Sequence, residues 1–127
     1  MSPIIIHNSN VPKMFDFLGL RLYGIMLFPF IFVTSRDYIT RHESTSRKKL
    51  TIENVVNHEK IHYAQCLETL VVGFYIMFIF EYLCNYYQTG NLAKSFINIR
   101  FEKEAYKYSH NHHYLSNRIP YSWLYYF

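Results

Sequence analysis

The chain has 127 residues, of which half are hydrophobic and one in five is aromatic, and its formal net charge is +4. This length supports one domain around a single core and is too short for two, so residues 1–127 are expected to form a single domain. The apolar composition excludes a disordered chain. The positive charge is modest and scattered apart from Arg47-Lys48-Lys49, which is typical of a solvated loop, and no recognition motif accompanies it, so we expect no nucleic-acid binding.

The N-terminal third contains the only segments that predict strands. Residues 4–6 are β-branched and precede a turn at residues 8–10, which favours a short strand. The apolar run at residues 22–33 is broken by Pro29, and its aromatic and β-branched end at residues 30–33 predicts a second strand. A proline at this place indicates an edge strand or the start of a strand. Residues 34–50 are polar and predict a loop with short structure.

Two long helices are predicted in the rest of the chain. Thr51 is a good N-cap for a helix that begins at Ile52 and continues to about Tyr87, with Gly73 as the place for a bend. Gly90 or Asn91 ends it, and a second helix covers residues 92–112. The predicted fold class is therefore α+β, mostly α, with a short N-terminal β element and two long helices that pack together.

The first of these helices contains a strongly apolar segment. Residues 70–80 carry no charge and end at Glu81. A bilayer span needs about 20 apolar residues, and a run this short more often forms a buried helix. Extension to Cys84 would place Glu81 in hydrocarbon, which is costly. The sequence favours a buried or membrane-surface helix, and membrane contact through residues 70–84 stays open as an alternative.

The sequence His58-Glu59-Lys60-Ile61-His62 is an H-E-x-x-H motif within the first helix. Two histidines four residues apart lie one above the other on a helix, about 40° apart, and can bind one Zn²⁺ ion together. Glu59 points about 100° away, where it can take a proton from water held beside the metal. The alternative is a solvated helix face with two unrelated histidines.

A catalytic zinc site needs a third protein ligand, for which Glu102 and Glu104 are the candidates. They lie about 200° apart on the second helix, so only one of them can face the motif. Ala105 shares the side of Glu102, and a small residue there lets two helices approach closely. We predict Glu102 as the third ligand, with Glu104 as the alternative.

With these residues the chain resembles the gluzincin metallopeptidases, which combine H-E-x-x-H with a downstream glutamate. In several gluzincin families that glutamate opens an E-x-E-A segment, as Glu102-Lys103-Glu104-Ala105 does here. The chain is also similar to small uncharacterised bacterial and phage H-E-x-x-H proteins. The similar segments are residues 27–30, residues 58–68 and the closing Tyr114-Leu115-x-x-Arg118.

The resemblance implies a zinc metallopeptidase or related hydrolase that acts on a peptide or protein. Zinc would be held by His58, His62 and Glu102, and Glu59 would be the general base. The chain departs from the larger families at Lys60, where an uncharged residue is usual, and at Tyr106, where aspartate is frequent. The rival hypothesis is a catalytically silent, metal-stabilised structural protein associated with a membrane or virion.

Further side chains near the motif have two interpretations each. Gln65 and Glu68 could be hydrogen-bond partners of the imidazoles or part of a solvated stripe. A histidine of the cluster at positions 110, 112 and 113 could stabilise an oxyanion, although capping of a helix end is favoured.

The cellular location is predicted from two weaker signals. The start of the chain shows no secretory signal, and two unpaired cysteines favour a reducing compartment. A cytoplasmic location is therefore expected, with membrane association as an alternative. The sequence does not define an oligomeric state.

Overall fold

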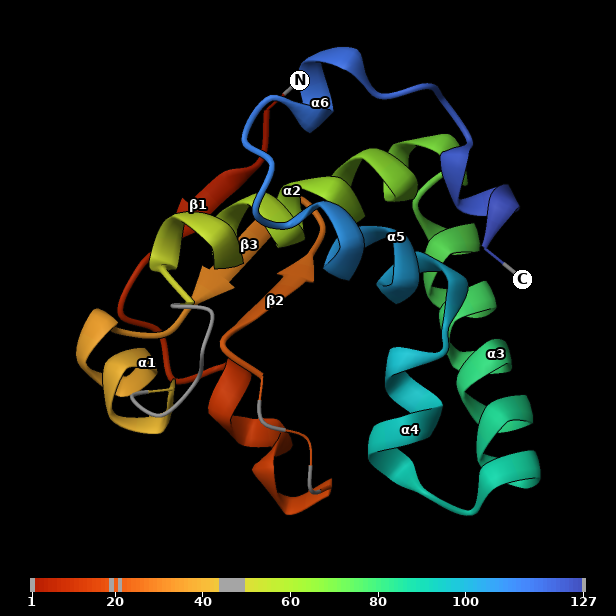
Figure 1. Cartoon of the computed structure of the whole chain (residues 1–127), viewed down its shortest axis with the longest axis horizontal. Coiled ribbons are helices and arrows are strands. Elements are labelled where there is room, and N and C mark those ends of the chain that lie inside the picture. Colours follow the sequence, from red (N-terminus) through yellow and green to blue (C-terminus); the bar gives the residue numbers. More distant parts are fainter. Residues whose placement is uncertain (1, 19, 21, 44–49, 127) are drawn as a thin grey trace.

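Three short strands form a mixed sheet near the N-terminus of the computed structural model, which describes residues 2–18, 20, 22–43 and 50–126 (Figure 1). The strands are β1 (Ile4–Ile6), β2 (Gly24–Leu27) and β3 (Phe30–Val33), in the spatial order β1-β3-β2. β1 is parallel to β3 and β2 is antiparallel to it. The predicted strands at residues 4–6 and 30–33 are confirmed.

Pro29 left two alternatives for β3, an edge strand or the start of a strand, and the structure shows the second. β3 is the central strand, and Pro29 precedes its first residue, where its missing N–H costs no ladder bond. The two edge strands are β1 and β2, and the hairpin that β2 forms with β3 was not predicted. A cis peptide bond between Phe28 and Pro29 lies in the turn of that hairpin.

Two short helical segments flank the hairpin. A 3₁₀ helix, η1 (Pro12–Leu18), connects β1 to β2, and α1 (Arg36–Glu43) follows β3. α1 accounts for the short structure expected between residues 34 and 50. The basic cluster at residues 47–49 lies outside the described residues.

The predicted long helix from Ile52 is divided into α2 (Ile52–Glu68) and α3 (Val72–Thr89), which meet at an angle of 111°. Thr51 caps α2 as predicted, because its hydroxyl accepts a hydrogen bond from the Asn54 N–H at 3.2 Å. The break lies at Leu70 and Val71, which adopt positive φ angles of 59° and 66°, and Gly73 is already inside α3. Gly90 ends α3 in the left-handed conformation.

The second predicted helix is also divided. α4 (Leu92–Ile97) runs back along α3, and α5 (Arg100–Tyr108) follows after a break at Asn98 and Ile99. A short α6 (Tyr114–Asn117) and the 3₁₀ helix η2 (Ser122–Tyr125) close the chain. The α+β, mostly α class is confirmed, but the helices that pack as predicted are α2 and α5 and are shorter than expected.

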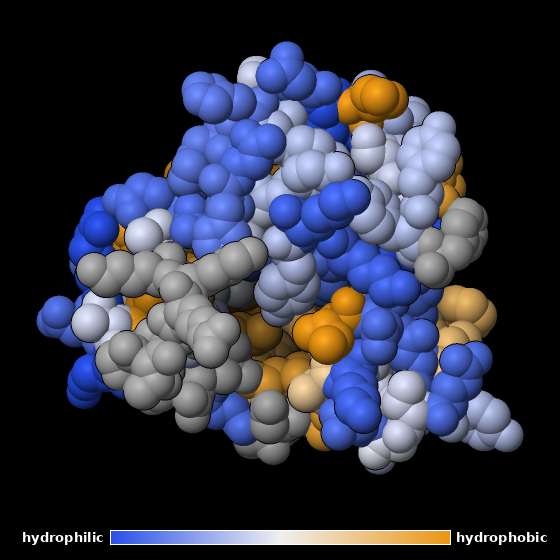
Figure 2. All heavy atoms as spheres, in the orientation of Figure 1, coloured by the Kyte–Doolittle hydropathy of each residue, from blue (hydrophilic) through white to orange (hydrophobic). Residues whose placement is uncertain are grey.

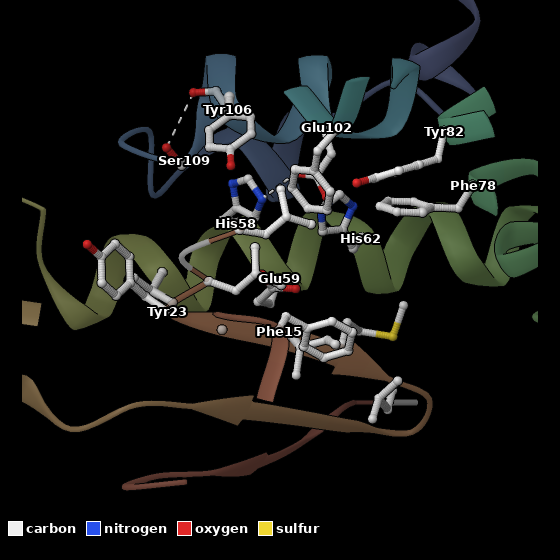
Figure 3. A pocket seen from close by; sticks show the side chains of 18 of the residues that line it. Phe15, Tyr23, His58, Glu59, His62, Phe78, Tyr82, Glu102, Tyr106 and Ser109 are labelled. Atoms are coloured by element: carbon white, nitrogen blue, oxygen red, sulfur yellow. Dashed lines mark hydrogen bonds and ion pairs between the residues drawn. The ribbon is translucent and has the colours of Figure 1, made fainter. Parts of the chain in front are cut away.

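The layers of the fold place α2 in the middle. One side of α2 packs on the sheet and the opposite side packs on α5 (Figures 1 and 3). Ala105 on α5 is fully buried, and its small side chain permits the close approach that the sequence indicated. The H-E-x-x-H motif therefore lies between the sheet and α5.

The apolar segment of α3 is only half-covered. Phe74 is the only residue of α3 that is buried, and several large apolar side chains of this helix are exposed. Of the two forms of the prediction, a buried or a membrane-surface helix, full burial does not hold, because the outer face of α3 is exposed. Among the described residues, no single helix has the length and hydropathy of a membrane span; α2 and α3 meet that criterion only when taken together as a bent pair.

Candidate metal centre

His58 and His62 point from α2 toward Glu102 on α5 (Figure 3). The Nε2 atom of His58 lies 3.0 Å from Oε1 of Glu102, and the Nε2 atom of His62 lies 2.9 Å from Oε2. One carboxylate therefore contacts both imidazoles of the motif. The helical spacing of four residues makes this possible because it brings both rings to the same side of α2.

The motif can hold a metal ion. One ligand atom from each of His58, Glu59 and His62 lies within 4.8 Å of the others, and all three side chains are buried or nearly so. A further sign comes from His62, whose Nε2 atom is buried and makes no aligned hydrogen bond although Glu102 is close. A buried nitrogen without a hydrogen bond is costly, and a bound cation would satisfy it.

Burial and neighbouring charges shift the pKa values of these three groups. Burial lowers the pKa of His62, but the neighbouring charge of Glu102 outweighs burial and raises this pKa to about 9. Burial raises the pKa of Glu102, and the charge of His62 with the hydrogen bond from His58 reverses this and lowers it to about 2. For Glu59 burial prevails and the pKa is raised. Two buried carboxylates thus share a site whose positive charge must come from the imidazoles or from a bound cation.

Gln65 fixes the second nitrogen of His62. Its side-chain oxygen lies 2.8 Å from His62 Nδ1, while its amide nitrogen donates to the Phe101 carbonyl at 3.1 Å and to Glu104 at 3.0 Å. The amide nitrogen is thus committed to acceptors, so the oxygen can only accept, and Nδ1 of His62 must carry the proton. This arrangement leaves Nε2 of His62 directed at Glu102, the orientation that a metal ligand needs.

Glu104 lies away from the histidines, in a second buried cluster that we call the Arg118 cluster. Arg118 forms ion pairs with both Glu104 and Glu68, and the Tyr114 hydroxyl donates to Glu104 at 2.6 Å. Glu68 also accepts from the Tyr121 backbone N–H and from Trp123 Nε1. Glu68 is therefore no direct partner of the imidazoles, whereas Gln65 is.

A cavity of about 580 Å³ opens beside the metal-binding group. It extends between β2 and helices α3, α4 and α5, and Figure 2 shows hydrophobic atoms within the hollow. Among the described residues that line the cavity, Glu59 and Glu102 are the only ones with a carboxylate, and none is a lysine or an arginine. The apolar lining of the cavity includes Met26, Leu27, Phe74, Phe78, Ile79, Leu83 and Phe96.

Tyr106 and His110 also line this cavity. The ring of Tyr106 packs edge-on against His58, with 4.6 Å between centroids, at the position where the larger gluzincin families place aspartate. His110 is exposed, and its Nδ1 lies 2.8 Å from the side-chain amide of Asn54. Neither contact was predicted, because a spacing pattern within one helix carries no signal for side chains that come from another part of the chain.

The edge strand β2 forms the cavity wall below Glu59. The backbone of Met26 hydrogen-bonds Glu59 and also accepts from the Tyr75 hydroxyl at 3.1 Å. The same Tyr75 oxygen accepts from the Phe28 N–H at 2.9 Å. The outward backbone groups of β2 at Met26 are therefore already paired within the chain.

Neither models of known protein families, nor curated proteins, nor solved structures match this chain. The gluzincin resemblance thus remains a prediction, and the chemistry of the site has to be argued from its own residues.

Proposed function

We propose that the protein is a zinc-dependent hydrolase, of the metallopeptidase kind, that uses His58, His62 and Glu102 as metal ligands and Glu59 as general base. The observation that carries the proposal is the carboxylate of Glu102, which contacts the Nε2 atoms of both motif histidines beside the buried Glu59. Two imidazole nitrogens and one carboxylate are the donor set of several catalytic zinc sites. Zinc, when bound, supplies a Lewis acid that polarises a carbonyl group and makes water more acidic.

The chain itself prepares the ligands. Gln65 accepts from His62 Nδ1 and thereby holds its Nε2 in the ligand orientation. Glu102 is held between the two imidazoles, so the distance between α2 and α5 sets the spacing of the three donors. The cavity beside the three donors has a mainly apolar wall, and electrostatic interactions are stronger in such surroundings than in bulk water.

Glu59 supplies the proton-transfer function. Its carboxylate would take a proton from the attacking water and pass it to the leaving group. Burial raises the pKa of Glu59 in the structure, which contains no metal ion, and a bound cation would act in the opposite direction. A hydrogen bond to the Met26 backbone restrains this side chain.

A catalytically silent, metal-stabilised protein is the second candidate. It is favoured by the edge strand β2, because Met26 already pairs with Glu59 and Tyr75 there. An extended peptide could not add to this strand at Met26 without displacing those bonds. A substrate would then be bound by side-chain contacts in the cavity.

Metal analysis and one isosteric variant separate the two candidates. We expect about one zinc per purified chain, lost in His58→Ala and His62→Ala. Glu59→Gln should keep the zinc and abolish cleavage of a pooled fluorogenic peptide library. Glu53→Gln is the matched control, since Glu53 lies on the same helix with its side chain exposed and should change neither quantity. Retention of zinc by the double histidine variant would refute the site, and zinc without any cleavage by wild type would favour the silent protein.

A further inference from the structure

The cavity beside the metal-binding group has apolar side chains on each of the five elements that surround it. They include Phe15 of η1, Met26 of β2, Val55 of α2, Phe78 of α3 and Phe96 of α4. Small-molecule sites in proteins are typically concave, mostly apolar cavities of about 300–1,000 Å³, and this one measures about 580 Å³. It therefore has the size and the lining of a binding site for a mainly apolar molecule.

The apolar wall begins directly at the metal-binding group. The ring of His62 contacts those of Phe74 and Phe78, with 5.8 Å and 6.5 Å between centroids, and Figure 3 shows Phe78 beside His62. Phe78 in turn contacts Phe96 on α4, with 5.7 Å between centroids. All four side chains line the cavity. A molecule whose reactive group lies at His62 is therefore expected to have its neighbouring atoms along this row of rings.

Several polar side chains in the wall already have partners within the chain. The hydroxyls of Tyr75, Tyr82 and Ser109 each donate to a backbone carbonyl, at 3.1, 3.4 and 3.3 Å. A hydroxyl carries one proton, so these three have none left for a bound molecule. The side chains of Asn54 and His110 pair with each other at 2.8 Å. Among the described residues, the wall therefore offers few hydrogen-bond donors to a ligand.

This lack of donors favours an acyl chain over a peptide. A peptide carries an N–H and a C=O group in every residue, and burial of such a group without a hydrogen bond is costly. The Met26 backbone on β2, which could have paired with a peptide strand, already bonds Glu59 and Tyr75. An acyl chain has no polar group beyond its carbonyl and needs no partner. A phosphate within the cavity would meet no lysine or arginine among the described lining residues.

The volume indicates the length of the chain. At about 580 Å³ the cavity is roughly four times the ~150 Å³ that accommodates one benzene ring, so a single ring would leave most of it unfilled. A chain of about ten carbons takes roughly half of this volume at the same packing and leaves room for the amide or ester group that follows. Ile79 and Leu83 line the cavity and are 58% and 61% exposed, so a chain can enter from solvent along them.

From these observations we propose that the cavity binds a neutral aliphatic acyl chain of up to about ten carbons, with the acyl carbonyl at the metal-binding group. Binding of the chain is independent of zinc, whereas its cleavage rests on the proposed hydrolase function. Water would add to the acyl carbonyl carbon, and the bond from this carbon to an amide nitrogen or ester oxygen would break. Glu59 would carry a proton of the water to the leaving nitrogen or oxygen, so the products are a carboxylic acid and an amine or alcohol. The substrate is then an acyl amide or acyl ester and not an extended peptide.

A series of neutral acyl glycinamides tests the binding by calorimetry. Hexanoyl-, octanoyl- and decanoylglycinamide are titrated into Glu59→Gln as purified, which should not cleave them, and into wild type after metal removal. Affinity should rise roughly tenfold for every two methylene groups, because each buried methylene adds a similar increment. A neutral alanine peptide, acetylated and amidated at its ends, should bind at least about tenfold more weakly than decanoylglycinamide. The proposal is overturned if affinity does not depend on chain length, or if the peptide binds as tightly.

Two pairs of substitutions on α3 test where the chain binds. Ile79→Asp/Leu83→Asp places two charges on the cavity wall and should weaken binding of decanoylglycinamide at least about tenfold. Ile76→Asp/Phe80→Asp is the matched control, because it changes two exposed apolar residues, also four positions apart, that do not line the cavity. Its affinity should stay near wild type, and circular dichroism checks that both variants fold. Equal affinities in the two variants would overturn the proposal, and the chain-length series decides the matter if the cavity variant does not fold.

Cleavage is measured separately, as release of decanoate by wild type from decanoylglycinamide and from methyl decanoate. Release from the glycinamide supports an acyl amide as the substrate, and release from the methyl ester alone supports an acyl ester. Chain-length-dependent binding without any release would refute the hydrolase and leave the acyl-binding site standing. Cleavage of the pooled peptides, with binding that does not depend on acyl length, would leave the hydrolase standing and overturn the acyl-binding site.

Discussion

Glu102 and Glu104 lie two residues apart on α5 and are both buried, but their surroundings differ in kind. Glu104 is surrounded by donors: Arg118, the Tyr114 hydroxyl and the Gln65 amide. Burial raises the pKa of Glu104, and these donors outweigh burial and lower it. Glu102 meets two imidazoles, and one of their nitrogens is left without a hydrogen bond.

This difference distinguishes a cluster whose polar groups all have partners within the chain from one in which a buried nitrogen has no hydrogen bond. In the Arg118 cluster, both carboxylates pair with the same guanidinium and accept their remaining hydrogen bonds from neutral donors within the chain, as in a structural ion-pair network. Around Glu102 the positive charge must come from the imidazoles or from a bound cation, so this cluster could hold a metal ion. Gln65 belongs to both clusters, because it joins Glu104 to His62. Through Gln65, the Arg118 cluster therefore restrains the orientation of His62.

The largest effect is expected from breaking the Arg118 cluster. Arg118→Met would leave Glu68 and Glu104 buried without their common partner. Loss of one partner from a buried ion pair costs about 3–5 kcal/mol, so the free energy of unfolding should fall by that amount in urea titrations. This is a large fraction of the total stability of a small domain, so partial unfolding is the expected result.

Arg36→Met is the matched control for this variant. Arg36 pairs with Glu53 at 2.8 Å, but both side chains are more than half exposed, and such pairs contribute little. Its free energy of unfolding should stay close to wild type. Equal losses in the two variants would contradict a structural role for the Arg118 cluster.

The next effect concerns zinc affinity and compares the two glutamates directly. Loss of a residue that supports a metal ligand typically lowers metal affinity 10–100-fold, or by about 1.4–2.7 kcal/mol. Glu102→Gln removes a proposed ligand itself and should lower zinc affinity by at least as much. Glu104→Gln should bind zinc nearly like wild type, because an amide oxygen in the place of Oε1 still accepts from Arg118 Nη2 and Gln65 Nε2. Competition with a chelator measures both constants. The reverse outcome, with zinc lost in Glu104→Gln and kept in Glu102→Gln, would show that α5 binds the metal through its other face.

Local patterns were sufficient to predict the strands at residues 4–6 and 30–33, the Thr51 cap and the end of α3 at Gly90, because each depends on a few adjacent residues. The breaks at Leu70–Val71 and Asn98–Ile99 were not predicted. Neither contains glycine or proline, and at the first of them α3 turns by 111° relative to α2 although Leu70 and Val71 must adopt positive φ angles. Tertiary contacts override local propensity at such places.

The same limit applies to the prediction of the site, where relations within one helix were predicted and contacts between elements were not. Helical spacing predicted that His58 and His62 share a face and that Glu102 and Glu104 do not, because these relations are internal to one helix. The pairing of Glu104 with Arg118 joins residues 14 positions apart through a turn that follows α5, and no periodicity reports it. The contact of Tyr106 with His58 depends on how α5 is rotated over α2. Contacts between elements were therefore the part that the sequence could not supply.

The prediction with the smallest expected effect compares the two sides of α2. Glu59 lies on the side that faces the sheet, and the proposed ligands lie on the side that faces α5. A Cβ at Gly24 on β2 would come within 2.8 Å of Val55 Cγ1 and 3.0 Å of Glu59 Cγ. Gly24→Ala should therefore push β2 and α2 apart at Glu59, with a loss of about 1–2 kcal/mol in unfolding free energy. Because His58 and His62 point to the other side of α2, toward Glu102 on α5, zinc affinity should stay near wild type while turnover falls.

Gly73→Ala is the control: its Cβ would meet Thr69 Cβ at 3.4 Å, an ordinary contact, and alanine within α3 should be neutral or stabilising by up to about 1 kcal/mol. A loss of zinc in Gly24→Ala, as large as in Glu102→Gln, would show that the two sides of α2 are not independent.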